Sequence, residues 1–104
     1  MGAAERRDCR GNAADMDPLS RLMKEEVVLD TGTPIIYIGK LVELTDHTFV
    51  LEQADMHDCR DGHLNKEAYL AETSRDGFAV NRRRVIVMRS VVISVSRLAD
   101  VVND

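Results

Sequence analysis

The segment that most restricts how this chain can fold is residues 34–44, with the sequence PIIYIGKLVEL. Apolar side chains occupy both alternating positions, so a strand formed here would be apolar on both faces. Such a strand is either covered on both faces or bent so that its two halves face different parts of a core. Gly39 stands in its middle, and a residue without a Cβ permits a sharp bend or a bulge. We therefore predict one long strand that bends at Gly39.

Four further strands are predicted from short runs rich in β-branched residues, at 25–30, 48–54, 85–88 and 91–95. Aromatic residues make up only 4% of the chain and tryptophan is absent, so the core has to be built from Val, Ile and Leu. Residues 30–33, with the sequence DTGT, have the composition of a turn between the first two strands.

Two short helices complete the predicted elements. Asp17 and Pro18 suit the start of a helix that ends near Lys24. Residues 67–73 fit either a helix or a strand, and we favour a helix because Asn65 can cap its start and Gly77 can end it. Five short, curved, antiparallel strands bury their apolar side chains best as a small barrel. The predicted fold is therefore all-β: a strongly bent, five-stranded antiparallel barrel with a short N-terminal helix.

The length of 104 residues indicates one domain, and no cofactor is expected. Residues 1–16 have no apolar periodicity and are expected to be a disordered tail, and 17–104 are expected to form the barrel domain, with an insertion at about 56–83. The net charge of −4, from 14 basic and 18 acidic side chains, argues against binding nucleic acid through the overall field. Cys9 and Cys59 are too few for a disulfide framework, and no apolar run is long enough to span a membrane. We expect a cytoplasmic protein.

Two short motifs resemble those of the Sm and Sm-like (LSm) proteins. The first is Gly39-Lys40-Leu41, followed by Asp46 and by Phe49-Val50-Leu51; the second is Met88-Arg89-Ser90-Val91-Val92-Ile93. The resemblance covers about residues 17–97 and implies a divergent member of the family. It departs from the family where an asparagine is expected, because Thr48, Phe49 or Val50 stands there, and where Ser90 replaces a glycine. In the family, those two positions belong to the pocket that holds a base of single-stranded RNA.

The resemblance implies a homo-oligomeric ring and a single-stranded RNA site. The last two strands would lie at open edges of the sheet, and pairing with a second copy would cover them. Asp46 and His47 lie on the turn that reads nucleotide in the family, although both are also ordinary turn residues. Arg89 would contact a base or a phosphate, or would pair with Asp46. Arg82, Arg83 and Arg84 form either a belt of phosphate contacts around the ring or a solvated start of a strand.

The stretch MHDCRDGH, residues 56–63, raises the separate question of a metal site. His57, Cys59 and His63 are residue types that bind zinc, and Asp58 and Asp61 could add to them. Their spacing matches no motif of known zinc sites, so we interpret the stretch as a polar loop that binds no metal.

Two functions from different classes remain open. The first is an Sm-like ring that binds single-stranded RNA weakly. The alternative is a homo-oligomeric scaffold that binds a protein or a metal through the insertion at 56–83, with no role in RNA binding. No catalytic motif is present, so we do not expect an enzyme.

Overall fold

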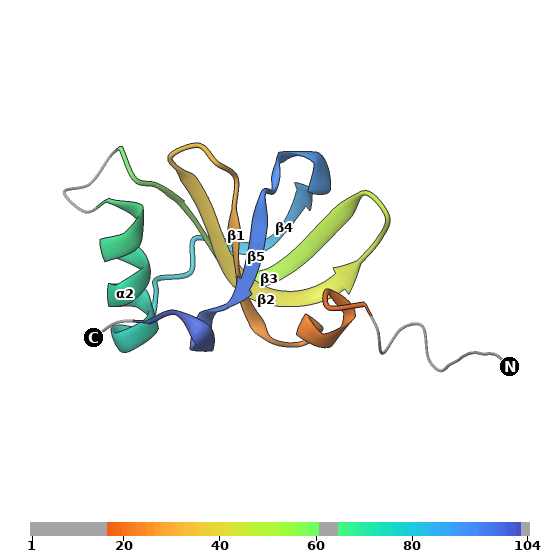
Figure 1. Ribbon diagram of the computed structural model, residues 1–104, viewed down its shortest axis with the longest axis horizontal. Coiled ribbons are helices and arrows are strands. Elements are labelled where there is room, and N and C mark those ends of the chain that lie inside the picture. The colour runs from red at the N-terminus through yellow and green to blue at the C-terminus, as the bar shows by residue number, and fades with distance from the viewer. Residues whose placement is uncertain (1–16, 61–64, 103–104) are drawn as a thin grey trace, which may run out of the picture.

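The computed structural model describes residues 17–60 and 65–102, and its five antiparallel strands form a single sheet (Figure 1). The strands are β1 (Glu26–Asp30), β2 (Ile35–Leu44), β3 (Thr48–Asp58), β4 (Arg82–Met88) and β5 (Ser94–Arg97), accompanied by helix α2 (Lys66–Asp76) and the 3-10 turns η1 (Ser20–Leu22), η2 (Arg89–Val91) and η3 (Leu98–Asp100). The strand order is β4-β3-β2-β1-β5. The predicted all-β fold is confirmed, but the sheet is not closed into a barrel, because β4 and β5 are its two ends. The expected tail, 1–16, lies outside the described residues.

The bend in the long strand involves both β2 and its partner β3 (Figure 1). Ile38 is opposite Asp55, whereas Lys40 is opposite Glu52, so a two-residue step on β2 faces a three-residue step on β3. The extra length on β3 contains Gln53, which has a φ of +50°. One additional residue in the left-handed region is typical of a β-bulge, and a bulge sharpens the local twist. The predicted bend is therefore present.

Gly39 is required by the close approach of β3 at this bulge. A Cβ built on Gly39 would lie 2.8 Å from the Cβ of Ala54 and 3.1 Å from its Cα. Atoms at these separations overlap, so only glycine fits between the two strands without moving them.

Apolar side chains gather on both faces of the sheet. The first cluster, here called the inner cluster, consists of Val27, Leu29, Leu41, Phe49, Leu51, Ala54 and Val87. The second, here called the α2-side cluster, consists of Val28, Ile36, Ile38, Tyr69 and Leu98. Residues from α2 and η3 thus cover the face of the sheet opposite to the inner cluster. The prediction explained the apolar residues on both faces of the long strand by a bend alone. The structure has the bend, and it also covers both faces of the strand.

The helix favoured at 67–73 is present as α2, which is longer and fills the span between the predicted end residues Asn65 and Gly77. Asn65 Oδ1 accepts a hydrogen bond from the Ala68 N–H at 2.8 Å, and Gly77 ends the helix with a φ of +85°. Tyr69, only 8% exposed, packs into the α2-side cluster. In the described part of the chain, no helix is long and apolar enough to cross a membrane.

The N-terminal helix is shorter than predicted. It is the single 3-10 turn Ser20–Leu22, whose N-cap is Leu19 and not Asp17; Asp17 accepts a hydrogen bond from the Leu19 N–H at 3.0 Å just before the turn. Lys24 then adopts a φ of +72°, and its N–H donates to the Leu41 carbonyl at 2.7 Å. Pairing with β2 therefore replaces the next helical turn.

Strand β3 is longer than predicted and includes the start of MHDCRDGH. Its pairing with β2 continues through Ile36 opposite His57 to Ile35 opposite Asp58. Residues 56–58 are thus part of a strand, and the prediction of a loop was wrong for them. The prediction relied on their polarity, which the pairing with an apolar strand overrides.

Strand β5 begins later than predicted. Arg89–Val91 form a 3-10 turn, and the Val92 N–H donates to the Arg89 carbonyl at 3.1 Å. The Ile93 N–H donates to the Asp30 carbonyl at 2.7 Å, so the chain reaches the sheet only there. The predicted strand at 91–95 was therefore wrong over its first three residues, although their β-branched side chains favour strands.

The two ends of the sheet are open, as the resemblance implied. Their backbone groups on the outer side have no strand partner within 17–60 and 65–102. Exposed apolar side chains lie on or next to these ends: Ile86, Met88, Val91 and Ile93.

Candidate nucleic-acid interface

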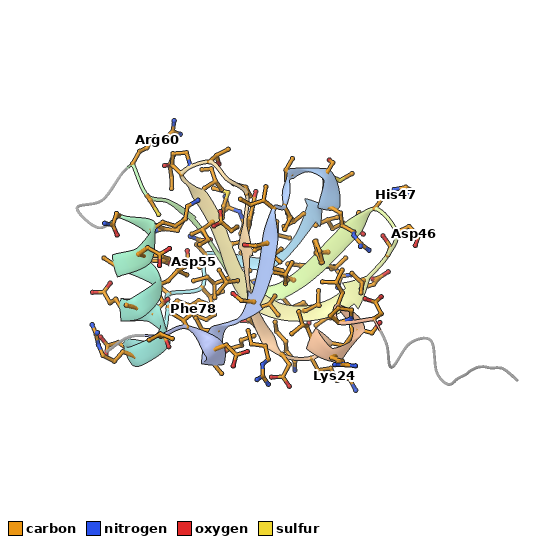
Figure 2. The ribbon with its side chains drawn as sticks, viewed as in Figure 1. Lys24, Asp46, His47, Asp55, Arg60 and Phe78 are labelled. Carbon is orange, nitrogen blue, oxygen red and sulfur yellow. The ribbon has the colours of Figure 1, made fainter. Side chains whose placement is uncertain are left out.

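The turn between β2 and β3 meets the connection between β4 and β5, and a cavity lies between them. Its volume is about 410 Å³, and it is lined by Asp46, His47, Met88, Arg89 and Ser90. Asp46 and His47 are exposed at the tip of the β2–β3 turn, as Figure 2 shows. The structure thus brings together three residues that the sequence singled out, although 42 positions separate His47 from Arg89 in the chain.

The β2–β3 turn is organised by hydrogen bonds of Thr45 and Thr48. The hydroxyl of Thr45 accepts from the His47 N–H at 3.1 Å and from the Thr48 N–H at 2.9 Å. Side-chain acceptors of this kind make a turn without help from Gly or Pro. The two side chains at the tip, Asp46 and His47, are therefore presented by an ordered backbone.

Arg89 connects the second loop to this turn. Its backbone N–H donates to the His47 carbonyl at 2.8 Å, and its Nη1 donates to the Thr45 carbonyl at 2.6 Å. The guanidinium carbon lies 5.3 Å from the centre of the Phe49 ring, within the range of a cation–π contact. The sequence left two roles open for Arg89, a contact with RNA or an ion pair with Asp46. In the described residues, Arg89 and Asp46 form no ion pair. The guanidinium retains donors that can meet a ligand, since only one of its five N–H groups bonds to a described residue.

The structure also shows where the residues lie that depart from the Sm motifs. Phe49 and Val50 are both 3% exposed, and Phe49 belongs to the inner cluster. Thr48 uses its hydroxyl within the turn, 2.7 Å from the hydroxyl of Thr45. A side-chain amide is thus missing from this part of the cavity, and a hydroxyl, on Ser90, is added at its edge.

The three arginines of β4 do not act as one cluster. Arg84 is paired with Glu52 at 2.9 Å and with Glu43 at 3.6 Å, so its charge is balanced within the protein. Arg82 and Arg83 have no carboxylate partner among the described residues. Alternate residues of a strand face opposite sides, so Arg83 points away from the other two. The cavity begins at Met88, about 13 Å along the strand from Arg84 at roughly 3.3 Å per residue.

His57 and Cys59, from the sequence MHDCRDGH, are used in packing. The rings of His57 and Tyr69 are stacked, with their centres 3.8 Å apart and their planes 3° from parallel. Burial raises the pKa of the Cys59 thiol, which keeps it protonated at neutral pH. Side-chain and backbone hydrogen bonds from Arg60 lower the pKa of Asp58 to about 2. Over 17–60 and 65–102, no three His, Cys, Asp or Glu side chains come together as metal ligands; Asp61 and His63 lie outside those residues.

A buried polar network between β3 and α2 was not predicted. Asp55, 6% exposed, accepts hydrogen bonds from the Tyr69 hydroxyl and, at 2.7 Å, from Asn81 Nδ2. Burial raises the pKa of Asp55, an effect that the charge of His57 and the hydrogen bond from Asn81 partly offset. Asn81 also bonds the backbone of Met56, as acceptor from its N–H at 3.0 Å and as donor to its carbonyl at 3.1 Å. No pattern in the sequence indicates these contacts, because the residues come from three separate segments.

Comparisons with known proteins identify the architecture. No family model matches the sequence, and no curated protein matches it. Among solved structures, the chain is similar to the Sm protein of Pyrococcus abyssii in complex with a uridine heptamer, with a TM-score of 0.52 and 20% sequence identity. The match covers 78% of this chain and 97% of that one. Together with the single five-stranded antiparallel sheet and its two open ends, this likeness shows that the protein has an Sm-like fold.

Proposed function

We propose that this protein assembles into a homo-oligomeric ring and binds single-stranded RNA weakly at the cavity between the β2–β3 turn and the β4–β5 connection. The observation that carries the proposal is the meeting of His47 and Arg89 in one cavity, on a fold whose solved neighbour is an Sm protein bound to a uridine heptamer. An imidazole and a guanidinium are groups on which an unpaired base stacks.

Two features indicate that binding is weak and local. The protein carries a net charge of −4, and Arg84 is balanced by two glutamates, so few positive charges are free to neutralise phosphates. The cavity also lacks a side-chain amide. Recognition would thus depend on stacking and on a small number of hydrogen bonds from each copy, multiplied by the number of copies in the ring.

Ring assembly would cover the open ends of the sheet. Unpaired strand edges next to exposed apolar side chains promote association, and head-to-tail pairing that closes into a ring leaves no edge free. Ile86 is 59% exposed on β4 and Ile93 is 70% exposed just before β5.

The alternative, a scaffold that captures a protein or metal through the insertion, has less support. Helix α2 directs Tyr69 towards its own sheet, while Glu67, Glu72, Arg75 and Asp76 remain exposed as a charged, solvated surface. We therefore favour the RNA-binding ring.

Replacing Arg89 with alanine is expected to weaken RNA binding by roughly tenfold or more, because a hydrogen bond from a charged group contributes roughly 1.5–3 kcal/mol and 1.4 kcal/mol corresponds to a factor of ten. The measurement is fluorescence anisotropy with labelled oligouridine and oligoadenosine at low and moderate salt. Arg84→Ala is the matched control, since it removes the same charge from an arginine already paired with Glu52 and Glu43; its affinity is expected to stay within about twofold.

Equal losses in the two variants would mean that only overall charge matters, and would contradict a specific site at Arg89. If the unaltered protein binds neither RNA at micromolar concentration in low salt, the RNA-binding proposal is wrong.

Native mass spectrometry from mild buffer is expected to detect several copies of the chain per particle, and Ile86→Lys is expected to lower that number. A charged side chain on an edge strand opposes pairing with another copy. Val102→Lys is the control, because Val102 is 79% exposed but follows η3 and belongs to neither edge strand. Single copies of the unaltered protein at micromolar concentration would exclude the ring.

A further inference from the structure

Thr45 uses nearly all of its polar atoms to hold the β2–β3 turn. Besides accepting from two backbone N–H groups, its hydroxyl lies 2.7 Å from the hydroxyl of Thr48, and its own N–H donates to the Thr48 carbonyl at 3.0 Å. These contacts fix the backbone position of His47, because the His47 N–H is one of the two groups that donate a hydrogen bond to the hydroxyl.

The backbone carbonyl of the same residue holds Arg89, the main candidate on the other loop. Nη1 of Arg89 donates to it at 2.6 Å, while the Arg89 N–H is bonded to the His47 carbonyl. Among residues 17–60 and 65–102, Thr45 is the one that bonds to both His47 and Arg89, although it does not line the cavity itself. Neither the motifs of the sequence nor the family resemblance singled it out.

We propose that Thr45 is the positioning residue of the candidate RNA site: its hydroxyl orders the turn, so that His47 is placed at the cavity while the Thr45 carbonyl holds Arg89 beside it. The inference rests on the proposed RNA-binding function. Thr45 is exposed, and exposed hydrogen bonds contribute little to stability because water replaces them. The consequence of losing the hydroxyl would therefore appear in the relative placement of His47 and Arg89 rather than in unfolding.

The test compares Thr45→Val, which keeps the shape and removes the hydroxyl, with Thr45→Ser, which keeps the hydroxyl. We expect Thr45→Val to weaken oligouridine binding by about tenfold, the effect of one misplaced charge-assisted hydrogen bond, and Thr45→Ser to stay within about threefold. Melting temperatures of the two variants are expected to be similar.

Thr31→Val provides a matched control at the other end of β2. The Thr31 hydroxyl organises the β1–β2 turn in the same way, accepting from the Thr33 N–H at 3.3 Å and donating to the Ile35 carbonyl at 2.8 Å. Because its bond to the Ile35 carbonyl is part-buried, the loss of this hydroxyl is expected to cost at least as much stability as Thr45→Val, and to leave RNA affinity unchanged.

Amide hydrogen exchange supplies a readout that does not need RNA. In Thr45→Val, the amides of Thr48 and Arg89 are expected to exchange faster than in Thr45→Ser, because the turn and its bond to the second loop loosen together. Unchanged exchange in Thr45→Val would overturn the inference whether or not RNA binds. If the unaltered protein binds RNA and Thr45→Val binds equally well, the inference fails while the proposed function stands; if the unaltered protein binds no RNA, the proposed function fails and exchange alone decides on Thr45.

Discussion

Replacing Gly39 with alanine is expected to lower the free energy of unfolding by about 3 kcal/mol, at the upper end of what inserting a methyl group into a packed site costs. The new Cβ would lie 2.8 Å from the Cβ of Ala54 and 3.3 Å from the Glu52 carbonyl oxygen. Neither neighbour is the free end of a flexible side chain, so β2 and β3 must separate at the bend. Urea denaturation followed by circular dichroism measures the loss as a shift of the midpoint.

The double variant Gly39→Ala, Ala54→Gly identifies the cause. Removing the Ala54 methyl abolishes the shortest contact, so the two changes together are expected to cost less than the sum of their separate effects. Gly77→Ala is the control for glycine loss without a clash: no atom lies within 4 Å of its added Cβ, but its φ of +85° is unfavourable for alanine. Additive effects at Gly39 and Ala54 would show that crowding is not the reason for the glycine.

Replacing Asp55 with alanine is expected to destabilise the protein by roughly 2–4 kcal/mol: the buried Tyr69 hydroxyl loses its acceptor, at roughly 1–3 kcal/mol, and the hydrogen bond to the more exposed Asn81 is lost, at roughly 1 kcal/mol. The donors are the Tyr69 hydroxyl and the Asn81 amide. Asp55→Asn is the matched variant, since its carbonyl can accept from Asn81 and its amide can donate to the oxygen of Tyr69. At pH 7 it is expected to be as stable as the unaltered protein, or more so, because it avoids burying a charge.

The pH dependence of this difference follows from the raised pKa of Asp55, whose main cause is burial. The folded state binds the proton more tightly than the unfolded state, where the pKa is 3.8. The stability contributed by the protonated carboxyl is therefore fully present below pH 3.8 and is lost as the pH rises through the folded pKa. Relative to Asp55→Asn, the unaltered protein should gain stability on acidification through that window. A relative loss there would contradict the prediction.

Sequence patterns predicted the strands well where local chemistry controls the backbone. Gly39, the turn at 30–33, and the caps of α2 at Asn65 and Gly77 are local signals, and the structure has each of them. The start of β5 could not be predicted, because Ile93 joins the sheet only through a hydrogen bond to Asp30, far away in the chain. The length of β3 was missed for a similar reason: its polar end is held by pairing with an apolar strand.

The candidate site was predictable only in part. His47, Asp46 and Arg89 were found through their resemblance to motifs, and the structure places all three around one cavity. Thr45 was not found, since a threonine after a strand is ordinary, and its contact with Arg89, 44 positions away, exists only in the folded chain. The ion pairs of Arg84 with Glu43 and Glu52 could not be predicted, because they depend on strand register.

The position of α2 has a consequence for the solubility of shortened forms of the protein. Ile36 and Ile38 are 0% exposed beneath it, and each fully buried aliphatic side chain contributes about 1.5–3 kcal/mol relative to exposure in water. A truncated chain with a short turn in place of 59–80 would leave an exposed apolar patch on this face of the sheet. Such a chain would be expected to aggregate. The insertion is therefore needed to cover the apolar side chains of the sheet.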